Sequence, residues 1–408
     1  MGSLLRIFWS RILWNASSKK VIFCLSFIIN SNMFFFQCPN NRDNKVIDEF
    51  PTIESELFKA FLQTELINEN EYHNPSLMYF QRAARTDKGV SALKQIISMN
   101  SNADLESYIP RINEKLPKQI RIFGAKRTTK YFDSKTFCDC RTYSYLMPSF
   151  TIDKNANESY RVSQEMIEKF NSILNKYVGT HNFHNFTSQK KPLDPSAKRY
   201  IISFDCSQPF LLKNSNYNDD NENDGDQKND VGKQMEFIVV RVKGQSFMLH
   251  QIRKMIGLAV AIMRGFVDQN IIERAFSIDR IDIPMAPGLG LMLEEAHFEQ
   301  YNKKYGGDGI HVPIIWDEFN DSIYDLKNQL IYPEIVDNEI KESSMTQWLS
   351  TLHIHTYDIR DHENIIKTKR SSEQTKNEEE TFDGDNVNEK DYEDSVCNKK
   401  IKSNPEST

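Results

Sequence analysis

The sequence predicts an α+β protein in which two ferredoxin-like halves share one mostly antiparallel sheet. The order strand, helix, strand, strand, helix, strand occurs twice in weak outline before residue 291, and such units commonly join into one sheet. The chain has 408 residues, of which 39% are hydrophobic and 26% charged. This is the composition of a globular protein with polar tails, long enough for one large domain or two modest ones.

The first series of elements is predicted from apolar runs, period-two alternation and one helix start signal. Thr52 can cap a helix whose first turn carries Glu54 and Glu56, which suits the helix dipole. On the last strand, period two places Arg141, Tyr143 and Tyr145 on one face. Strands are expected at residues 21–29, 78–84, 90–99, 120–128 and 140–147, and helices after Thr52 and at residues 104–116.

The second series of elements begins with a helix of strong 3.6-residue periodicity. A loop rich in His and Asn, residues 179–188, follows that helix. A second strong helix has an inward face that begins at Leu249 and ends near Gly265. Helices are expected at residues 163–178 and 249–264, and strands at residues 199–206 and 235–243.

Composition divides the rest of the chain. We expect an N-terminal extension over residues 1–19, two folded halves over residues 20–150 and 151–305, a C-terminal extension over residues 306–355 and a disordered tail over residues 356–408. An insertion in the second half, residues 213–234, is rich in Asn and Asp and cannot bury a core.

The net charge of −6 argues against a nucleic-acid partner only until its distribution is considered. Residues 82–212 hold 21 Lys and Arg against 12 Asp and Glu, whereas residues 214–230 hold six acids against one Lys. Because counterion release depends on local charge, the basic centre can still attract phosphate.

No pattern of metal ligands is present. The six cysteines form no CxxC pair, and Cys138 and Cys140 would point to opposite faces of a strand. Reduced thiols are the favoured interpretation, and we expect no metal and no cofactor. His181 and His184 have a spacing that could serve a metal, but they lack further ligands nearby in the sequence. The longest apolar run, residues 21–29, is half the length that spans a bilayer, so we expect no membrane partner.

The string Arg82-Ala-Ala-Arg-Thr-Asp-Lys-Gly-Val-Ser-Ala92 is the first candidate for chemistry. Taken alone, Asp87 before a glycine is more often a turn former than a catalytic group, and Arg85 is as often a solvated charge. The whole string, however, resembles the active-site motif of TruA-type pseudouridine synthases. Further strings match the eukaryotic multisite tRNA-modifying branch of that family in the same order. They are CDCRTYSYLMPSF from Cys138, GTHNFHNFT from Gly179, GQSFMLHQIRKMIG from Gly244 and APGLGL from Ala286. The last string agrees with the family's closing strand, so the resemblance implies a strand at residues 286–291.

This resemblance, which runs from about residue 50 to residue 305, implies a tRNA-modifying isomerase with a central active-site cleft. Its substrate would be uridine in tRNA, which it converts to pseudouridine without a cofactor. Asp87 matches the family's catalytic carboxylate, which acts as a nucleophile or base. Arg253 matches the arginine that keeps this carboxylate ionised, which we expect it to do through a direct charge-assisted contact with Asp87. Tyr143 matches the tyrosine that stacks on the flipped base. On pattern alone, Arg253 could be a cation on an exposed helix face and Tyr143 a half-buried core residue.

The remaining candidates would bind RNA. The resemblance implies that Arg85 holds the space left by the extruded base or a neighbouring phosphate. Lys88 and Arg141 are further candidate contacts, and Phe247 and His250 are expected to line the pocket, with core packing and helix-end polarity as their alternatives. The stretch from Asn30 to Gln37 departs from the family pattern, since Asn30 and Phe35 stand where glycine is usual.

Two other classes of function remain open at this stage. A tRNA-binding chaperone without catalysis is the main alternative, although such a relative would usually have lost Asp87 or Arg253. A metal-dependent nuclease lacks a second clustered acid. Messenger RNA or small nuclear RNA could be further substrates, and the oligomeric state is open.

We expect a nuclear location, with the mitochondrion as the alternative. The first twenty residues contain Arg6, Arg11, Lys19 and Lys20 and no acid, which is the composition of a transit peptide. A plain N-terminal extension without any address fits the same residues.

Overall fold

Strands make up the centre of the molecule. The computed structural model describes residues 19–28, 52–103, 105–156, 160–188, 190–213 and 234–358, all of which belong to one unit, residues 1–359. The strands are β1 (Lys19–Phe27), β2 (Gln81–Arg82), β3 (Ser91–Ser101), β4 (Ile120–Arg127), β5 (Cys140–Pro148), β6 (Gly179–Asn182), β7 (Lys198–Cys206), β8 (Phe210–Lys213), β9 (Gln234–Gly244) and β10 (Leu291–His297).

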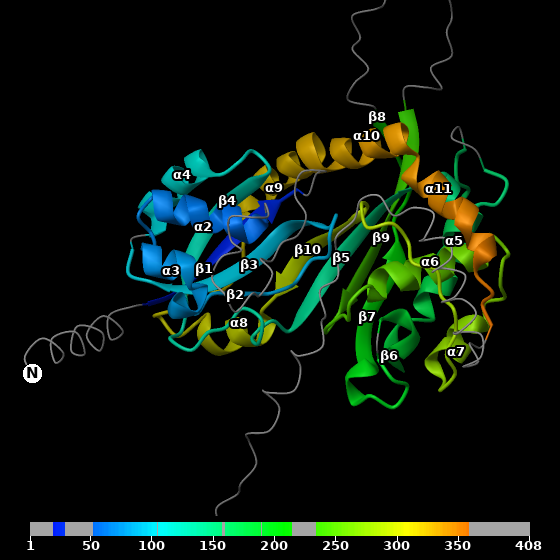
Figure 1. The fold of residues 1–408 in the computed structure, drawn as a ribbon, viewed down its shortest axis with the longest axis horizontal. Helices are drawn as coiled ribbons and strands as arrows, with labels where there is room; N and C mark the ends of the chain where they lie inside the picture. The colour runs from blue at the N-terminus through cyan, green and yellow to red at the C-terminus, as the bar shows by residue number, and fades with distance from the viewer. Residues whose placement is uncertain are drawn as a thin grey trace, which may run out of the picture. The chain divides into compact units, whose positions relative to one another are not determined.

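These ten strands of the described residues form one sheet in the order β4-β1-β3-β10-β5-β9-β7-β6 (Figure 1). The short strands β2 and β8 pair with β3 and β9. Every pairing is antiparallel except that of β10 with β3, where Met292 lies opposite Ser91. The predicted class, α+β with one mostly antiparallel sheet, is therefore confirmed, and β10 joins the strands of the N-terminal part to those that follow.

Helices cover both faces of the sheet. They are α2 (Ile53–Gln63), α3 (Glu69–His73), α4 (Leu105–Lys115), α5 (Gln164–Asn175), α6 (Gln251–Met263), α7 (Ile271–Phe276), α8 (Glu299–Tyr305), α9 (Asn320–Leu326), α10 (Tyr332–Glu342) and α11 (Ser344–Thr351). The predicted cap of α2 is confirmed: the Thr52 hydroxyl accepts a hydrogen bond from the Ser55 backbone N–H, and the Ser55 hydroxyl oxygen accepts one from the Thr52 N–H.

One face of the sheet carries two separate groups of helices over a continuous core. Apolar side chains of α2 and α4 pack on β1, β3 and β4, and those of α5 and α6 pack on β5, β7 and β9. In Figure 1 the two groups stand on the left and right of the view. On β5, between the groups, Tyr143, Tyr145 and Met147 share this core, as their period-two spacing predicts.

The opposite face is covered by the segment after β10. Residues of α9 and α10 pack against Leu93, Leu146, Phe237, Val239 and Met292 of the sheet. Tyr301 of α8 and Trp316 pack on Ile22 and Cys24 of β1. Residues 306–355, which we expected only as an extension, thus bury apolar surface that the strands would otherwise expose.

Some expectations for individual elements were wrong. The expected strand at residues 78–84 is reduced to two residues, because a 3₁₀ turn at Pro75–Met78 precedes it. The expected loop at residues 179–188 begins with the edge strand β6, and β8 was not predicted. The closing strand starts at Leu291, after the APGLG loop, and Leu249 is 46% exposed before α6 begins.

Other expectations fall outside the described residues: the extension before residue 19, the atypical stretch 30–37, residues 214–233 of the insertion and the tail after residue 358. The ends of the insertion are nevertheless close together, because Lys213 lies opposite Gln234 in the β8–β9 pair.

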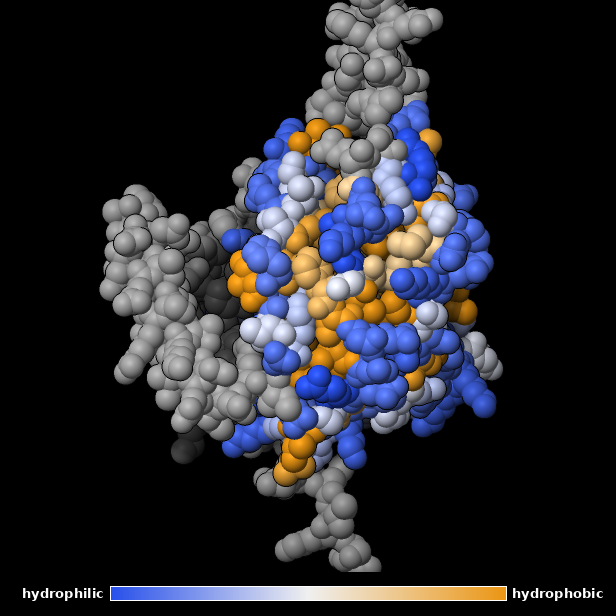
Figure 2. All heavy atoms as spheres, turned by 90° about the vertical axis from the view of Figure 1, so that its right-hand side faces the viewer, coloured by the Kyte–Doolittle hydropathy of each residue, from blue (hydrophilic) through white to orange (hydrophobic). Residues whose placement is uncertain are grey.

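One side of the molecule shows apolar side chains gathered among hydrophilic ones (Figure 2). It is the side on which α5, α7 and α11 lie in Figure 1. Large apolar residues that stay exposed directly after α6, α7 and α11 are Phe266, Ile278 and Ile354. Among the described residues, no helix combines the length and the apolar character needed to cross a bilayer.

Candidate active site

Asp87 lies in the loop between β2 and β3. The Val90 N–H donates to the Asp87 carbonyl oxygen at 3.1 Å, and Gly89 has a φ of +80°. Glycine adopts this conformation without the steric cost that a Cβ would bring, so the chain turns directly into β3. The Asp87 side chain keeps 26% of its surface exposed, which leaves the carboxylate accessible from solvent.

The loop before Asp87 is held by hydrogen bonds to its backbone. Gln95, which is fully buried on β3, accepts from the Ala84 N–H at 3.2 Å and donates to the Ala84 carbonyl at 2.8 Å. Arg82 forms an ion pair with the buried Glu54 of α2, with Nε and Oε1 2.6 Å apart. These contacts fix the position from which Asp87 projects.

The imidazole of His250 lies beside the Asp87 carboxylate. Its Nε2 lies 3.9 Å from Asp87 Oδ2. His250 directly precedes α6 with a φ of +63°, a left-handed conformation that is uncommon for a residue other than glycine. The strained turn before α6 thus aims the imidazole at the carboxylate.

Arg253, in the first turn of α6, approaches the same place. Its Nε donates to the Ala286 carbonyl at 2.7 Å. Burial lowers the pKa of Arg253, while the nearby Tyr145 and Asp87 act in the opposite direction. The guanidinium makes no ion pair with Asp87 among the described contacts, so the expected direct pair is absent here and the two charges interact over a longer distance.

The APGLG loop packs between Arg253 and the turn of Asp87. A methyl group on Gly288 would lie 3.2 Å from the Lys88 carbonyl oxygen and 3.6 Å from Arg253 Cζ. The Tyr145 hydroxyl donates to the Pro287 carbonyl at 2.7 Å. Sequence reasoning did not assign Tyr145, Gln95 or this loop to the site. For Tyr145, the signal was its place on the same strand face as Tyr143.

Tyr143 and Phe247 form the aromatic part of the site. Their rings are edge to face, with centroids 5.3 Å apart. Tyr143 is only 7% exposed, and burial raises the pKa of its hydroxyl; Arg141 lowers this pKa and Asp87 raises it further. The phenol therefore stays neutral at physiological pH and presents an apolar ring edge with one polar group.

The cations predicted to bind RNA differ in their surroundings. Arg85 and Lys88 are exposed on either side of Asp87. Arg141, in contrast, donates to three backbone carbonyls, those of Ala83, Gln245 and Lys135. Arg85 and Lys88 thus have the access that a phosphate contact needs.

The histidines of the GTHNFHNFT string are engaged within the fold. His181 Nε2 lies 3.0 Å from the Val178 carbonyl oxygen, and its ring stacks on Phe276 at 4.2 Å. His184 is fully buried, with Nε2 3.1 Å from the Asp279 carbonyl oxygen. Across the residues that the structure describes, no three His, Cys, Asp or Glu side chains are grouped to hold a metal ion.

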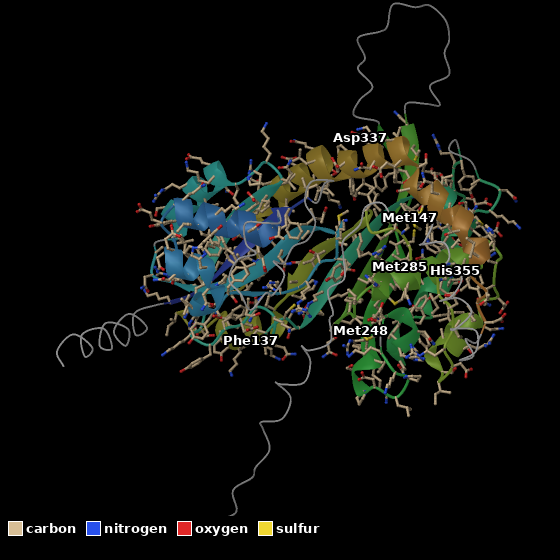
Figure 3. The ribbon with its side chains drawn as sticks, in the orientation of Figure 1. Phe137, Met147, Met248, Met285, Asp337 and His355 are labelled. Atoms are coloured by element: carbon tan, nitrogen blue, oxygen red, sulfur yellow. The ribbon has the colours of Figure 1, made fainter. Side chains whose placement is uncertain are left out.

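The loop that follows α7 packs against α6. Figure 3 draws Met248, in the turn before α6, and Met285, in the loop that receives Arg253, together with His355 from the chain after α11. His355 Nδ1 lies 2.9 Å from Asp282 Oδ2, so the C-terminal segment is tied to the same loop.

The candidate site therefore combines one accessible carboxylate with two basic side chains, a neutral phenol and an aromatic wall. Such a set can support nucleophilic attack or proton transfer by a single carboxylate.

Comparison with known proteins points to one family. A family model described as tRNA pseudouridine synthase matches residues 173–299, a range that includes Phe247, His250 and Arg253. Proteins named pseudouridylate synthase 1 homolog from Mus musculus and Homo sapiens are both 46% identical over 313 residues. These alignments cover 76% of this chain and 69% and 68% of the relatives. The tRNA pseudouridine synthase 1 of Yarrowia lipolytica is 30% identical over 396 residues, covering 75% of this chain and 70% of the relative.

Proposed function

Because the chain belongs to the tRNA pseudouridine synthase family, we propose that it isomerises uridine to pseudouridine in tRNA. The observation that carries this proposal is the 46% identity to two pseudouridylate synthase homologs over three quarters of the chain. The site geometry agrees with it, since one accessible carboxylate lies among basic and aromatic side chains.

The reaction needs a carboxylate that can act twice. The bond between N1 of uracil and C1′ of ribose breaks, the base rotates, and a bond forms between C5 and C1′. Asp87 either attacks C1′ as a nucleophile or removes a proton at C2′ as a base, and the first step releases uracil with its electron pair. When C5 bonds to C1′, the Asp87–C1′ bond of the first route breaks, or the proton taken from C2′ in the second route returns to C2′. The proton on C5 is then lost and N1 takes one up. Atoms and electrons balance without an external redox partner or cofactor.

The neighbours of Asp87 supply positive charge beside it and place the substrate. Arg253, held by Ala286, provides a positive field beside the carboxylate. His250, 3.9 Å from Asp87, can donate to the carboxylate or to the substrate. The Tyr143 ring, braced by Phe247, offers a stacking surface for a base turned out of its helix.

The division of the sheet suits a folded RNA. We propose two ferredoxin-like halves, residues 20–150 and 151–305, with the active-site cleft between them. The support for this cleft is that α2 and α4 cover one part of the sheet, α5 and α6 another, and Tyr143 and Tyr145 lie between. Arg85 and Lys88 at the rim would contact phosphates, or Arg85 would fill the space that the target base leaves.

Substitution of Asp87 by Asn tests this function. Asp87→Asn keeps the shape of the side chain and removes its charge and basicity. We expect no pseudouridine in a single-turnover assay on tRNA, with the dissociation constant for tRNA within about threefold of wild type, because phosphate contacts dominate affinity. Asp321→Asn, an exposed position on α9, is the matched control and should keep full activity. Turnover by Asp87→Asn would exclude Asp87 as the catalytic carboxylate.

The same two assays, applied to wild type, separate catalysis from tRNA binding alone. If wild type binds tRNA tightly but forms no pseudouridine in any tRNA offered, the molecule is a binding protein on this fold.

We propose a nuclear location, with the mitochondrion as the alternative, and messenger or small nuclear RNA as further substrates. Imaging the full chain beside a chain that starts at Lys19, and mapping pseudouridine in total RNA with and without the protein, would test these proposals.

A further inference from the structure

Arg141 lies where the loop of Asp87 meets the turn before α6. It is on β5, two residues before Tyr143. Its Nε and Nη2 both donate to the Ala83 carbonyl, at 3.0 and 2.7 Å, and its Nη1 donates to the Gln245 carbonyl at 3.1 Å. Nη2 also reaches the Lys135 carbonyl at 3.4 Å. One guanidinium therefore holds backbone oxygens from three segments that are distant in sequence.

These hydrogen bonds leave little of the side chain for a phosphate. A guanidinium has five N–H donors in a planar fork, and three of its nitrogens already donate here. A bidentate contact with a phosphate would therefore break at least one of these bonds to carbonyls at a partly buried site. Arg85 and Lys88, in contrast, are exposed beside Asp87.

The held carbonyls stand at the start of the two loops that build the site. Ala83 is four residues before Asp87, whose loop ends in β3; Gln245 is five residues before His250, where α6 begins. Each loop is thus fixed at its far end by a regular element and at its near end by Arg141. Where the loops converge, the Asp87 carboxylate and the His250 imidazole are 3.9 Å apart.

We propose that Arg141 is a positioning residue that sets the distance between the Asp87 loop and the turn carrying Phe247 and His250. This inference rests on the proposed function, since it assigns Arg141 a part in that reaction. It takes Arg141 out of the group of RNA contacts. A displacement of about 1 Å in a catalytic group can cost about 10²-fold in rate, so loss of the fork should act on the chemical step.

The test separates the rate of the chemical step from RNA binding. Arg141→Gln should lower the single-turnover rate constant by about 10²-fold, while the dissociation constant for tRNA and its salt dependence stay near those of wild type. Arg141→Lys keeps the charge but replaces the fork by a single ammonium, so it should restore only part of the rate. Arg85→Gln is the contrasting variant: it should weaken tRNA binding and reduce the slope of log K against log salt by about 1.

Three outcomes would overturn the proposal. Weaker tRNA binding with a smaller salt slope in Arg141→Gln, at an unchanged rate constant, would mean that Arg141 contacts RNA. Full activity of Arg141→Gln, or full rescue by Arg141→Lys, would mean that the fork does not matter. Thermal unfolding of each variant is recorded first, and Arg141→Lys decides the question if Arg141→Gln does not fold. Failure of the proposed function is a different result, since wild type itself would then form no pseudouridine.

Discussion

At the scale of single residues, His250 links backbone strain to the candidate chemistry. A left-handed conformation costs about 1–3 kcal/mol for a residue other than glycine, and such residues gather at functional sites. His250 adopts it directly before α6, which turns the imidazole toward Asp87. The string GQSFMLHQIRKMIG led us to expect His250 in the pocket, but its spacing alone could not show which group it would face.

Arg253 differs from the expectation in an instructive way. We expected a direct pair with Asp87, and the structure instead attaches Arg253 Nε to the Ala286 carbonyl. Sequence patterns place Arg253 on the helix, but the receiving loop lies 33 residues further along the chain and carries no polar side chain that would announce it. Backbone acceptors of this kind are invisible to reasoning from residue types.

This geometry predicts that the orientation of Arg253 matters as well as its charge. Arg253→Ala should lower the single-turnover rate constant by about 10²–10³-fold, the effect of removing one preorganised electrostatic partner. Arg253→Lys keeps the charge, but a single ammonium cannot both replace the Nε–Ala286 hydrogen bond and supply positive charge beside Asp87. This variant should therefore recover less than a tenth of the wild-type rate. A rate in Arg253→Lys close to wild type would show that charge alone is needed.

At the scale of elements, long periodic segments were predicted well and short edge strands were not. The helix α6 and the strands β3, β5 and β9 follow from apolar periodicity and β-branched or aromatic residues. The four-residue strand β6 lacks this signal, because it consists of Gly, Thr, His and Asn and forms by pairing with β7. Strand β8 is mostly apolar but only four residues long, too short to show a period. Tertiary pairing, and not local propensity, decides such segments.

The contact of α6 with the loop before β10 depends on a glycine. A Cβ on Gly257 would lie 2.3 Å from the Pro284 carbonyl oxygen, closer than two such atoms can approach. Because that oxygen belongs to the backbone, relief requires α6 or the loop to move. The same loop receives Arg253, so this packing contact adjoins the candidate site.

We therefore predict that Gly257→Ala destabilises the protein by at least about 1–3 kcal/mol and lowers activity. Gly307→Ala is the matched control, since its methyl group would meet nothing within 4 Å and the change should be neutral or slightly stabilising. Denaturant midpoints of both variants beside wild type provide the measurement. Equal midpoints for Gly257→Ala and Gly307→Ala would contradict the close approach.

At the scale of the whole molecule, the order of strands was beyond the reach of the sequence. The two series of elements predicted one shared sheet, but nothing in the apolar patterns marks β10 as the neighbour of β3, about two hundred residues away. The cover on the second face was equally hidden. Residues of α9 and α10 have an amphipathic pattern, yet their partners on β5 and β9 are set only by the folded arrangement.

Buried thiols make the stability of the whole fold sensitive to alkaline pH. All four cysteines in the described part of the chain are free and buried. Burial raises the pKa of Cys138 to about 11 and that of Cys206 to about 12, from an ordinary value of 9.0. The unfolded chain therefore releases these protons first, and their contribution to stability is complete below pH 9 and declines as the pH rises toward 11–12. Lys20 acts oppositely between its lowered pKa of about 8 and its ordinary 10.5.

A comparison of slopes isolates the thiol effect, because Lys20 is common to all variants. Between pH 9 and 10.5, the free energy of unfolding should fall less steeply in Cys206→Ser and Cys206→Ala than in wild type. The difference is at most about 1.4 kcal/mol per pH unit for one group. Both variants should flatten the curve equally even if their stabilities differ, since neither side chain titrates. Unchanged slopes would place the alkaline loss elsewhere.

The parallel pairing of β3 with β10 also has a consequence for biosynthesis. Within the described sheet, β10 is the only strand that joins β4-β1-β3 to β5-β9-β7-β6. On the ribosome, β3 emerges long before its neighbour, and at about 5–20 residues per second some tens of seconds pass before Met292 follows Ser91. During that interval the nascent chain presents an unpaired strand edge, the kind of surface that invites aggregation and chaperone binding. Slow codons before β10 would lengthen this exposure.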